Sequence, residues 1–251
     1  MLRAVFFDIG KTLVDDPFPK AKYAVGAFLA QKGVLNPSKL DVFHETLTLE
    51  NARMDSYQFS HFWGEDEIFT CALARYGIHD DRLVKQALAV YRQKVQLLYQ
   101  TDPSLKALSN KELASLLSWL QDRKGLILGV ISDERIASIA LYWDTLECGD
   151  FFPLVVTSEE VGCRKPCEPI FRHALEVAKV KAEESLYVGD NPARDVVGAK
   201  SVGMISVLFT KFCNQPTLVR PDFTIDDLRE LHPVISALNS SSRGSQSEAK
   251  E

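Results

Sequence analysis

The spacing of apolar and polar positions changes character several times along the chain. A short apolar run over Leu2–Asp8 ends at a polar turn, which is typical of a buried parallel strand. From about Pro19 to Gln100, apolar residues recur at three- and four-residue spacing, which predicts amphipathic helices and no convincing strand. The predicted helices are Ala21–Lys32, Pro37–Met54, His61–Tyr76 and Asp80–Leu98. We interpret this stretch as an all-helical insert.

After Asp102-Pro103 the pattern alternates between helix and strand. Strands are predicted at Leu126–Ile131, Leu154–Thr157, Ser185–Val188 and Ile205–Leu208, helices at Asn110–Arg123, Arg135–Leu146, Glu168–Ala178 and Ala193–Val202, and a last strand and helix within Phe223–Leu238. This alternation predicts an α/β fold with a doubly wound, Rossmann-like parallel sheet covered by helices on both faces. The expected domains are a core from residues 1–16 and 101–238, a helical domain from 17–100, and a disordered tail at 239–251, which has no large apolar residue.

Composition narrows the class of protein further. The net charge of -5 argues against a nucleic-acid or anionic-membrane surface, since both attract clustered Lys and Arg. The five scattered cysteines predict no disulfide framework and favour a reducing, cytoplasmic compartment. Cys163 and Cys167 lie close together without a second Cys/His pair to complete a zinc site, and we interpret them as unpaired loop residues. No signal-peptide pattern and no membrane-spanning apolar run is present, and no feature indicates an oligomeric state.

Polar residues follow four of the predicted strands. Ligands of open α/β sheets bind outside the carboxyl ends of the strands, so these positions are the first candidates for a site. They are Asp8, Ser132, Lys165 in the loop after the third strand, and Asp190 with Asp195 behind it. A carboxylate can serve as nucleophile toward a phosphoryl group, a divalent cation such as Mg²⁺ can be held by carboxylate oxygens, and a lysine and a hydroxyl can hold the phosphate oxygens. The set therefore predicts phosphoryl-transfer chemistry on a small phosphorylated metabolite.

Four segments, in order, resemble the motifs of the haloacid dehalogenase-like (HAD) hydrolase superfamily. They are Asp8-Ile9-Gly10-Lys11-Thr12, similar to Asp-x-Asp-x-Thr; Ile131-Ser132, similar to a strand ending in Ser or Thr; Lys165-Pro166 with Pro169-Ile170-Phe171, similar to Lys-Pro-x-x-x-Ile-Phe; and Gly189-Asp190 with Asp195, similar to Gly-Asp-x-x-x-x-Asp. The resemblance implies subfamily I, in which a helical type-one cap closes over the substrate. It also implies that Asp8 is the nucleophile and a Mg²⁺ ligand, that Thr12 and Ser132 bind phosphate, and that Lys165 neutralises Asp8 and the phosphoryl oxygens. By the same resemblance, Asp190 and Asp195 bind or support the metal.

Gly10 departs from the family's first motif. In phosphatases of this family the same position carries a second Asp, which protonates the leaving alcohol and then activates water. Gly10 keeps the backbone carbonyl that the family also uses as a metal ligand, but it has no acid, and a positioned proton donor typically contributes ~10²–10⁴-fold in rate. The loss matters less for good leaving groups such as anomeric, acyl or aryl phosphates. The residues considered as substitutes are Lys11, Asp15, Asp16, Glu50, Arg53, Asp55, Tyr57, His61, Glu65 and Asp66.

Three other functions remain open from the sequence. A 2-haloacid dehalogenase of the same fold also lacks the second Asp, although the Gly189-Asp190 pair favours a metal and phosphate. Phosphonate cleavage requires a lysine of the cap, and Lys20, Lys22 and Lys32 have no distinguishing context. A non-catalytic binding or regulatory protein is the alternative from a different class. Substrate choice would depend on the helical insert, with candidates Arg53, Tyr57, Phe59, His61 and Trp63.

Overall fold

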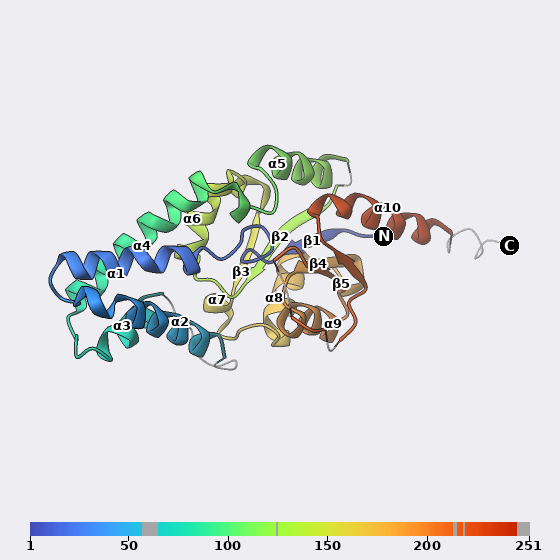
Figure 1. Cartoon of the computed structure of the whole chain (residues 1–251). Helices are drawn as coiled ribbons and strands as arrows, with labels where there is room; N and C mark the ends of the chain where they lie inside the picture. Colours follow the sequence, from blue (N-terminus) through green and yellow to red (C-terminus); the bar gives the residue numbers. More distant parts are fainter. Residues whose placement is uncertain (57–64, 124, 213–214, 218, 245–251) are drawn as a thin grey trace. The chain divides into compact units, whose positions relative to one another are not determined.

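A computed structural model describes residues 1–56, 65–123, 125–212, 215–217 and 219–244, with side chains throughout except at 54–56, 65, 123 and 240–244. The chain forms two compact units, one from Met1–Asp15 with Lys106–Glu251 and one from Asp16–Leu105 (Figure 1). The first unit contains a parallel sheet and the second contains helices, so the two are treated separately below.

The first unit is built on a six-stranded, fully parallel sheet. Its strands are β1 (Ala4–Phe7), β2 (Ile127–Ser132), β3 (Leu154–Thr157), β4 (Ser185–Gly189), β5 (Ile205–Phe209) and β6 (Phe223–Ile225). They lie in the order β3-β2-β1-β4-β5-β6. The chain moves outward from β1 in one direction through β2 and β3, and then in the other direction through β4, β5 and β6. The predicted doubly wound α/β fold is confirmed, and β1 lies at its topological switch point.

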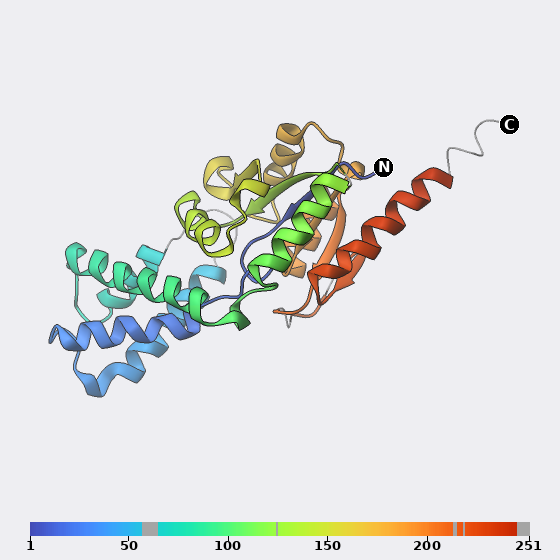
Figure 2. The same cartoon turned by 90° about the horizontal axis from the view of Figure 1, so that it is seen from above.

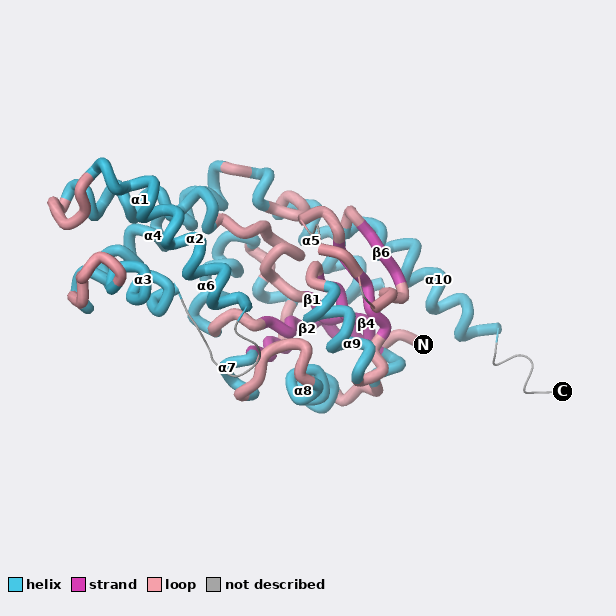
Figure 3. The backbone as a smooth tube through the Cα atoms, turned by 60° about the horizontal axis from the view of Figure 1, so that its bottom comes forward, coloured by secondary structure: helices cyan, strands magenta, loops and turns pink. Residues whose placement is uncertain are grey.

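Helices cover both faces of this sheet (Figures 2 and 3). They are α5 (Asn110–Ser118) continued by a π-helical turn at Trp119–Arg123, α6 (Ile136–Leu146), α7 (Ser158–Val161), α8 (Glu168–Ala178), a π-helical turn at Pro192–Val196 continued by α9 (Val197–Ser201), and α10 (Leu231–Gly244). Short 3-10 turns lie at Gly149–Phe151, Ala182–Glu184 and Leu228–Glu230. Figure 2 shows α5 and α10 side by side on one face, where the rings of Trp119 and His232 are 4.0 Å apart. The opposite face is covered by α8 and α9.

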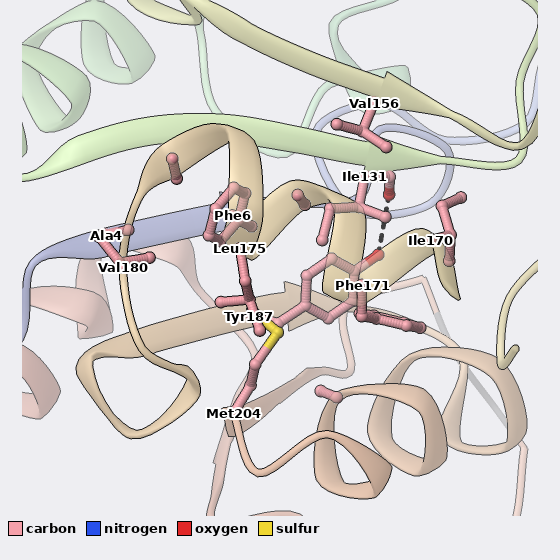
Figure 4. Close-up of a cluster of buried hydrophobic side chains, with 13 residues drawn as sticks. Ala4, Phe6, Ile131, Val156, Ile170, Phe171, Leu175, Val180, Tyr187 and Met204 are labelled. Carbon is pink, nitrogen blue, oxygen red and sulfur yellow. Dashed lines mark hydrogen bonds between the residues drawn. The ribbon is translucent and has the colours of Figure 1, made fainter. Parts of the chain in front are cut away.

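The alternation of side chains along β1 explains how its apolar run is buried on both faces. Ala4 and Phe6 belong to the core under α8, together with Phe171 and Tyr187 (Figure 4). Phe7 points to the other face and contacts the ring of Phe152, with 5.9 Å between ring centroids. Burial of both faces requires an uninterrupted apolar strand, which is the pattern seen in the sequence.

The second unit contains four helices and, within its described residues, no strand. They are α1 (Phe18–Gln31), α2 (Leu40–Ser56) preceded by a 3-10 turn at Pro37–Lys39, α3 (Glu65–Ala74) and α4 (Asp81–Thr101) followed by a 3-10 turn at Pro103–Leu105. Helix α1 packs against α2 and α4, and α3 packs against α2 and α4. The ring of Tyr91 contacts those of Phe18 and Phe69 at 5.9 and 5.2 Å between centroids. Residues 61–64 of the predicted third helix lie outside the described residues.

The last helix extends beyond the predicted boundary at Leu238. Helix α10 continues to Gly244, so residues 239–244 are helical rather than disordered, and 245–251 lie outside the described residues. The helix is anchored by Leu231 and Ile235, which are fully buried. The side chain of Asn239 also accepts a hydrogen bond from Leu2 N at 3.2 Å. These tertiary contacts stabilise a helix that the Ser-rich sequence disfavours.

The helical unit leaves and rejoins the sheet unit at neighbouring points. Val14 forms an antiparallel bridge with Lys106, and Ala107 N donates to Leu13 O at 2.9 Å. The turn before this bridge is held by Lys11 N, which donates to Val14 O at 2.5 Å. The two ends of the insertion are therefore fixed to each other within the sheet unit.

None of the described helices combines the length and the apolar character needed to cross a lipid bilayer.

Candidate active site

Asp8 is the first residue after β1, and the register of the sheet fixes its position. Phe7 lies opposite Val130 on β2 and Val188 on β4, so Asp8 emerges between the carboxyl ends of both neighbours. Asp8 N donates to Val188 O at 2.8 Å, and Asp8 Oδ1 accepts a hydrogen bond from Ile9 N at 2.9 Å. The carboxylate is thus held at the switch point, where ligands of such sheets bind.

Lys165 is the positive centre of the site. Its side chain is only 2% exposed, and its Nζ lies 2.9 Å from Asp8 Oδ2 and 2.7 Å from Asp195 Oδ1. Nζ also donates to the hydroxyl of Tyr187 at 2.9 Å. A lysine ammonium has three donors and no acceptor, so all three of its N–H groups have partners. A charge buried this deeply is tolerated because it is both paired and hydrogen-bonded.

The loop that carries Lys165 is held by Asp133, which directly follows Ser132 at the end of β2. Asp133 Oδ1 accepts a hydrogen bond from Lys165 N at 2.9 Å, and the hydroxyl of Ser158 donates to Asp133 O at 3.2 Å. Arg164 Nε and Arg194 Nη1 each lie 3.7 Å from Asp133 Oδ2. One carboxylate therefore connects the ends of β2, the Lys165 loop and the segment after β4.

The segment after β4 supplies two further carboxylates. Asn191 caps the helical turn that follows, because its Oδ1 accepts from Ala193 N at 3.0 Å and from Arg194 N at 3.1 Å. Asp195 Oδ2 accepts from Asn191 N at 2.8 Å, which orients its other oxygen toward Lys165. Gly189 permits this approach, since a Cβ at that position would lie 2.4 Å from the Asp195 carboxyl carbon.

Asp8, Asp190 and Asp195 form a buried acidic cluster in which one oxygen from each lies within 4.8 Å of the others. Burial raises the pKa of Asp8 to about 6, against the opposing effect of Lys165. Burial, together with the charges of Asp195 and Asp8, raises the pKa of Asp190 to about 7. Burial alone would lower the pKa of Lys165, but the charges of Asp195 and Asp8 raise it above its ordinary value. The lysine therefore stays charged while the carboxylates repel one another.

This donor set fits a divalent cation bound by oxygen. Three carboxylates share one lysine, which leaves an excess of negative charge that disfavours full ionisation of the cluster. A hard cation such as Mg²⁺ prefers carboxylate oxygens and would offset the repulsion. Among the described residues, Asp8, Asp190 and Asp195 form the group of acidic, His or Cys side chains close enough to hold a metal.

The remaining predicted site residues lie at the same edge of the sheet. Thr12 is fully buried in the turn after β1, and its Oγ1 has no hydrogen-bond partner in the described part of the chain. Ser132 ends β2, is buried, and accepts a hydrogen bond from Glu134 N at 3.2 Å. Neither hydroxyl forms a hydrogen bond with Asp8, Lys165, Asp190 or Asp195. Gly10 follows Asp8 by two positions, and a Cβ built on it meets no atom within 4 Å.

The residues considered as substitute acids belong partly to the sheet unit, partly to the helical unit and partly to the stretch outside the described residues. Lys11 is exposed and adopts a left-handed backbone conformation with φ 55°. In the helical unit, Glu50 is buried and ion-paired with Arg53 and Arg75, so it has a structural role there. Asp16 caps a turn by accepting from Phe18 N at 2.9 Å. Tyr57, Phe59, His61 and Trp63, and the side chains of Asp55 and Glu65, lie outside the described residues.

Two members of the site were missed by sequence reasoning. Tyr187 lies inside β4, where its hydroxyl donates to Ile131 O at 3.0 Å (Figure 4). The same hydroxyl accepts a hydrogen bond from Lys165 Nζ. A tyrosine in an apolar strand is indistinguishable from a core residue in the sequence, and only the pairing of β4 with β1 brings it under Lys165. Asp133 could have been found, because an acidic residue follows the candidate Ser132 at a strand end.

Comparisons with known proteins agree with this fold. The profile of the haloacid dehalogenase-like hydrolase family matches residues 42–209. A glyceraldehyde 3-phosphate phosphatase of Methanocaldococcus jannaschii is 27% identical over 248 residues, which cover 95% of this chain and 99% of the relative. The solved structure of a 2-haloacid dehalogenase from Pseudomonas syringae pv. Tomato DC3000 is 25% identical with a TM-score of 0.68, covering 94% of this chain and 99% of the other.

A further solved structure extends the likeness in fold. A HAD-hydrolase of Bacillus subtilis bound to magnesium is 19% identical with a TM-score of 0.65, and the match covers 94% of this chain and 99% of the other. The family profile extends over most of the chain, from α2 in the helical unit to the end of β5. This chain belongs to the haloacid dehalogenase-like hydrolase family.

Proposed function

We propose that the protein is a Mg²⁺-dependent phosphatase that hydrolyses a small phosphorylated metabolite through an aspartyl-phosphate on Asp8. The observation that carries the proposal is the placement of the Asp8 carboxylate. One of its oxygens contacts the buried ammonium of Lys165 at 2.9 Å, and it shares a cluster with Asp190 and Asp195. The M. jannaschii relative that aligns over almost the whole chain is named a phosphatase, which supports the same chemistry.

The roles of the residues follow from their contacts. Asp8 is the proposed nucleophile: its oxygen attacks phosphorus, the bond to the leaving oxygen breaks, and the acyl-phosphate is later cleaved by water, which returns the carboxylate. Lys165 lies against Asp8 and would hold the phosphoryl oxygens as charge develops on them. The unpartnered Thr12 hydroxyl supports a phosphate contact, because a buried hydroxyl without a partner is costly until a ligand pairs with it.

Asp8 and Asp190 are the proposed side-chain ligands of Mg²⁺, with the Gly10 carbonyl beside them and Asp195 as support. When bound, the cation supplies charge neutralisation between the carboxylates and the phosphate. Asp195 is already committed to Lys165 and to Asn191 N, so we assign it mainly to holding Lys165 in place. Tyr187 and Asp133 are positioning residues, since they act on Lys165 through its side chain and backbone.

Gly10 limits the substrates that can react quickly. With no carboxyl at this position, no side chain there can donate a proton to the leaving oxygen. The loss of rate is greatest for alkyl phosphates, whose leaving groups need that proton most. We therefore propose a substrate with a stabilised leaving group, such as an anomeric, acyl or aryl phosphate. We further propose that the helical unit, residues 16–105, is the cap that selects this substrate.

Hydrolysis of p-nitrophenyl phosphate tests the proposal, because its leaving group needs little protonation. The wild-type protein should turn over with Mg²⁺ and lose activity with EDTA, and Asp8→Asn should abolish turnover. Asp144→Asn, an exposed carboxylate on α6, is the matched control and should keep full activity. Binding of Mg²⁺ without turnover of any phosphate in a panel of anomeric, acyl, aryl and alkyl esters would favour a binding or regulatory protein instead.

Dehalogenation is the second candidate, because the P. syringae dehalogenase aligns with 94% of this chain. The acidic cluster argues for phosphate, since displacement of a halide by a carboxylate needs no cation at Asp190. Incubation with 2-chloropropionate should release no chloride above the Asp8→Asn background. Release that is independent of Mg²⁺ would reverse this assignment.

A further inference from the structure

His44 is a buried histidine in the first half of α2, in the helical unit. The residue is 8% exposed, and neither of its ring nitrogens reaches solvent or has a hydrogen-bond partner in the described part of the chain. A neutral imidazole has one N–H donor and one acceptor, and burying such groups without partners is costly. The proposed phosphatase chemistry uses residues of the sheet unit and leaves this histidine without a role.

The imidazole of His44 packs directly against the backbone of α1 at Gly26. A Cβ built on Gly26 would lie 2.2 Å from His44 Nε2 and 3.0 Å from its Cε1. Gly26 is a buried residue in the interior of α1, where glycine is less favourable than alanine. The close approach of the ring accounts for a glycine at this position, since a side chain there would displace the imidazole. Helices α1 and α2 are therefore joined at this point by a contact between a ring and a backbone.

Aromatic rings flank the same imidazole. The ring of Tyr23, on α1, meets that of His44 edge to face with 4.5 Å between centroids, and the ring of Phe43 lies at 6.1 Å. On the side of α3, the ring of Tyr76 contacts Phe43 at 5.5 Å, while its hydroxyl lies 3.3 Å from Thr46 Oγ1. These surroundings can accommodate a neutral ring, but they offer no acceptor that would stabilise a charged one.

A lysine adds to the cost of a charge on His44. Lys22 Nζ, on α1, donates to Thr48 Oγ1 at 2.6 Å, and Thr48 Oγ1 donates to His44 O at 2.9 Å, so the ammonium is held beside the turn of α2 that begins at His44. Asp41, one turn earlier on α2, is the opposing negative charge, and Lys39 in the preceding 3-10 turn is exposed. Burial and then Lys22 lower the pKa of His44 from its ordinary value of 6.5, against the effect of Asp41.

We propose that His44 is a pH-sensitive switch in the helical unit, at which protonation separates α1 from α2 under mildly acidic conditions. A protonated ring would carry two N–H donors without acceptors, next to the charge of Lys22. It cannot move closer to α1, because the backbone at Gly26 already contacts it. The imidazolium can therefore regain water only if the contact between the two helices opens. This inference does not depend on the proposed phosphatase function.

The direction of the pH effect follows from the two states of His44. When the helices are apart, the ring binds a proton below its ordinary pKa of 6.5, whereas the packed ring binds one only at lower pH. The contact between α1 and α2 therefore has its full stability above that pH and loses stability as pH falls below it. Uptake of one proton on opening raises the open fraction by up to about tenfold for each pH unit.

Nuclear magnetic resonance and hydrogen exchange on the full chain test the proposal. The imidazole resonances of His44 should titrate with a midpoint below 6.5. Protection of the backbone amides of α1 and α2, corrected for the intrinsic pH dependence of exchange, should fall by about three- to tenfold between pH ~7.5 and pH ~5.5. The amides of β1 and β4 are the internal control and should not lose protection, because the raised pKa values of Asp8 and Asp190 act in the opposite direction.

Matched variants separate His44 from other titrating groups. His44→Leu removes the ring, so the protection of α1 and α2 should change with pH by less than about twofold. Gly26→Ala should displace the ring into water, which moves its midpoint up toward 6.5 and abolishes the acid-induced loss. His173→Gln, at a partly exposed position on α8, is the control and should keep the wild-type loss.

A wild-type His44 that titrates at or above 6.5 overturns the proposal, as does protection of α1 and α2 that is unchanged at acidic pH. A His44→Leu chain that keeps the full acid-induced loss also overturns it. If neither variant folds, the titration and the exchange of the wild-type chain still decide the question. None of these measurements requires turnover, so a protein without phosphatase activity contradicts the proposed function alone.

Discussion

The ammonium of Lys165 lies 2.7 Å from a carboxylate oxygen of Asp195, and both side chains are almost completely buried. This ion pair joins the loop after β3 to the segment after β4 across the end of the sheet. Removing one partner of a buried pair leaves the other charge without compensation, which is more costly than the pair is stabilising. Breaking this ion pair should therefore change both the geometry of the site and the stability of the sheet unit.

Lys165→Met should lower the free energy of unfolding by about 3–5 kcal/mol, because Asp8 and Asp195 lose their shared cation in a buried place. Urea denaturation in EDTA measures the effect. Lys181→Met is the control, since its pairing with Glu183 is exposed, and it should change stability by less than about 0.5 kcal/mol. Equal effects of the two substitutions would show that the Lys165 pairs contribute no more than a surface contact.

Gly10→Asp should fold normally, because a Cβ built on Gly10 meets no atom within 4 Å. If this position is that of the missing acid, the new carboxyl should raise kcat for an alkyl phosphate by about 10²–10⁴-fold. It should change p-nitrophenyl phosphate hydrolysis much less, since that leaving group needs no proton. Gly10→Asn has nearly the same shape without the acid and should give no gain. A gain with Asn equal to that with Asp would contradict a proton-transfer role.

Gly189→Ala, in contrast, should lower both activity and stability. The added methyl would lie 2.4 Å from the Asp195 carboxyl carbon, so the Asp195 side chain must move away from Lys165 and Asn191 N. We expect loss of the Mg²⁺-dependent activity and a destabilisation of about 1–3 kcal/mol from overpacking. Gly10→Ala adds the same methyl in open space and is the control. Activity and Mg²⁺ titrations of the two variants would be alike if the close approach at Gly189 had no role.

The Mg²⁺-induced stabilisation should increase with pH. The pKa of Asp8 is raised to about 6 and that of Asp190 to about 7, from 3.8 for an unperturbed Asp, so in this range the folded, metal-free protein holds protons that the unfolded chain has released. The contribution of these groups to the free energy of unfolding is present at low pH and falls as pH rises through about 4 to 7. Mg²⁺ must displace the bound protons, so its effect should be small near pH ~5 and large near pH ~7.5.

Melting temperatures with and without Mg²⁺ across this range measure the pH effect. Asp190→Asn should remove most of the increase, and the exposed Asp144→Asn should keep it. A Mg²⁺ shift that is larger at the acidic end would contradict the assignment of these carboxylates as ligands.

The elements that the sequence predicts best are those whose ends carry strong local signals. β3 and α8 have the predicted bounds, since each apolar segment ends at polar or turn residues, with Pro169 in the first turn of α8. The predicted end of α10 was wrong, because the last residues of this helix depend on tertiary contacts rather than on helix propensity. Asn239 is held by Leu2 N, a residue 237 positions away, and no local pattern records such a contact.

The candidate site shows the same division. Asp8, Lys165, Asp190 and Asp195 were predicted as a group because parallel strands place their carboxyl ends at one edge. In the structure Lys165 contacts Asp8 and Asp195, and one oxygen from each of the three carboxylates lies within 4.8 Å of the others. Their roles in catalysis and metal binding, and those of Gly10, Thr12 and Ser132, stay predictions. Tyr187 could not be identified from the sequence, since its role depends on the neighbours that the strand register supplies, whereas Asp133 could have been found because it directly follows Ser132 at a strand end.

The bridge between Val14 and Lys106 has a consequence for how this protein can diversify. Viewed from the sheet, the whole helical insertion has the same two ends as a tight hairpin loop, because Leu13 and Ala107 are already hydrogen-bonded to each other. The entropic cost of closing a loop grows slowly, by about 0.6 kcal/mol for each doubling of its length. Evolution can therefore lengthen, shorten or exchange the inserted segment while the register of β1, and with it the position of Asp8, stays fixed. The junction therefore lets the inserted segment change independently of the strand that carries Asp8.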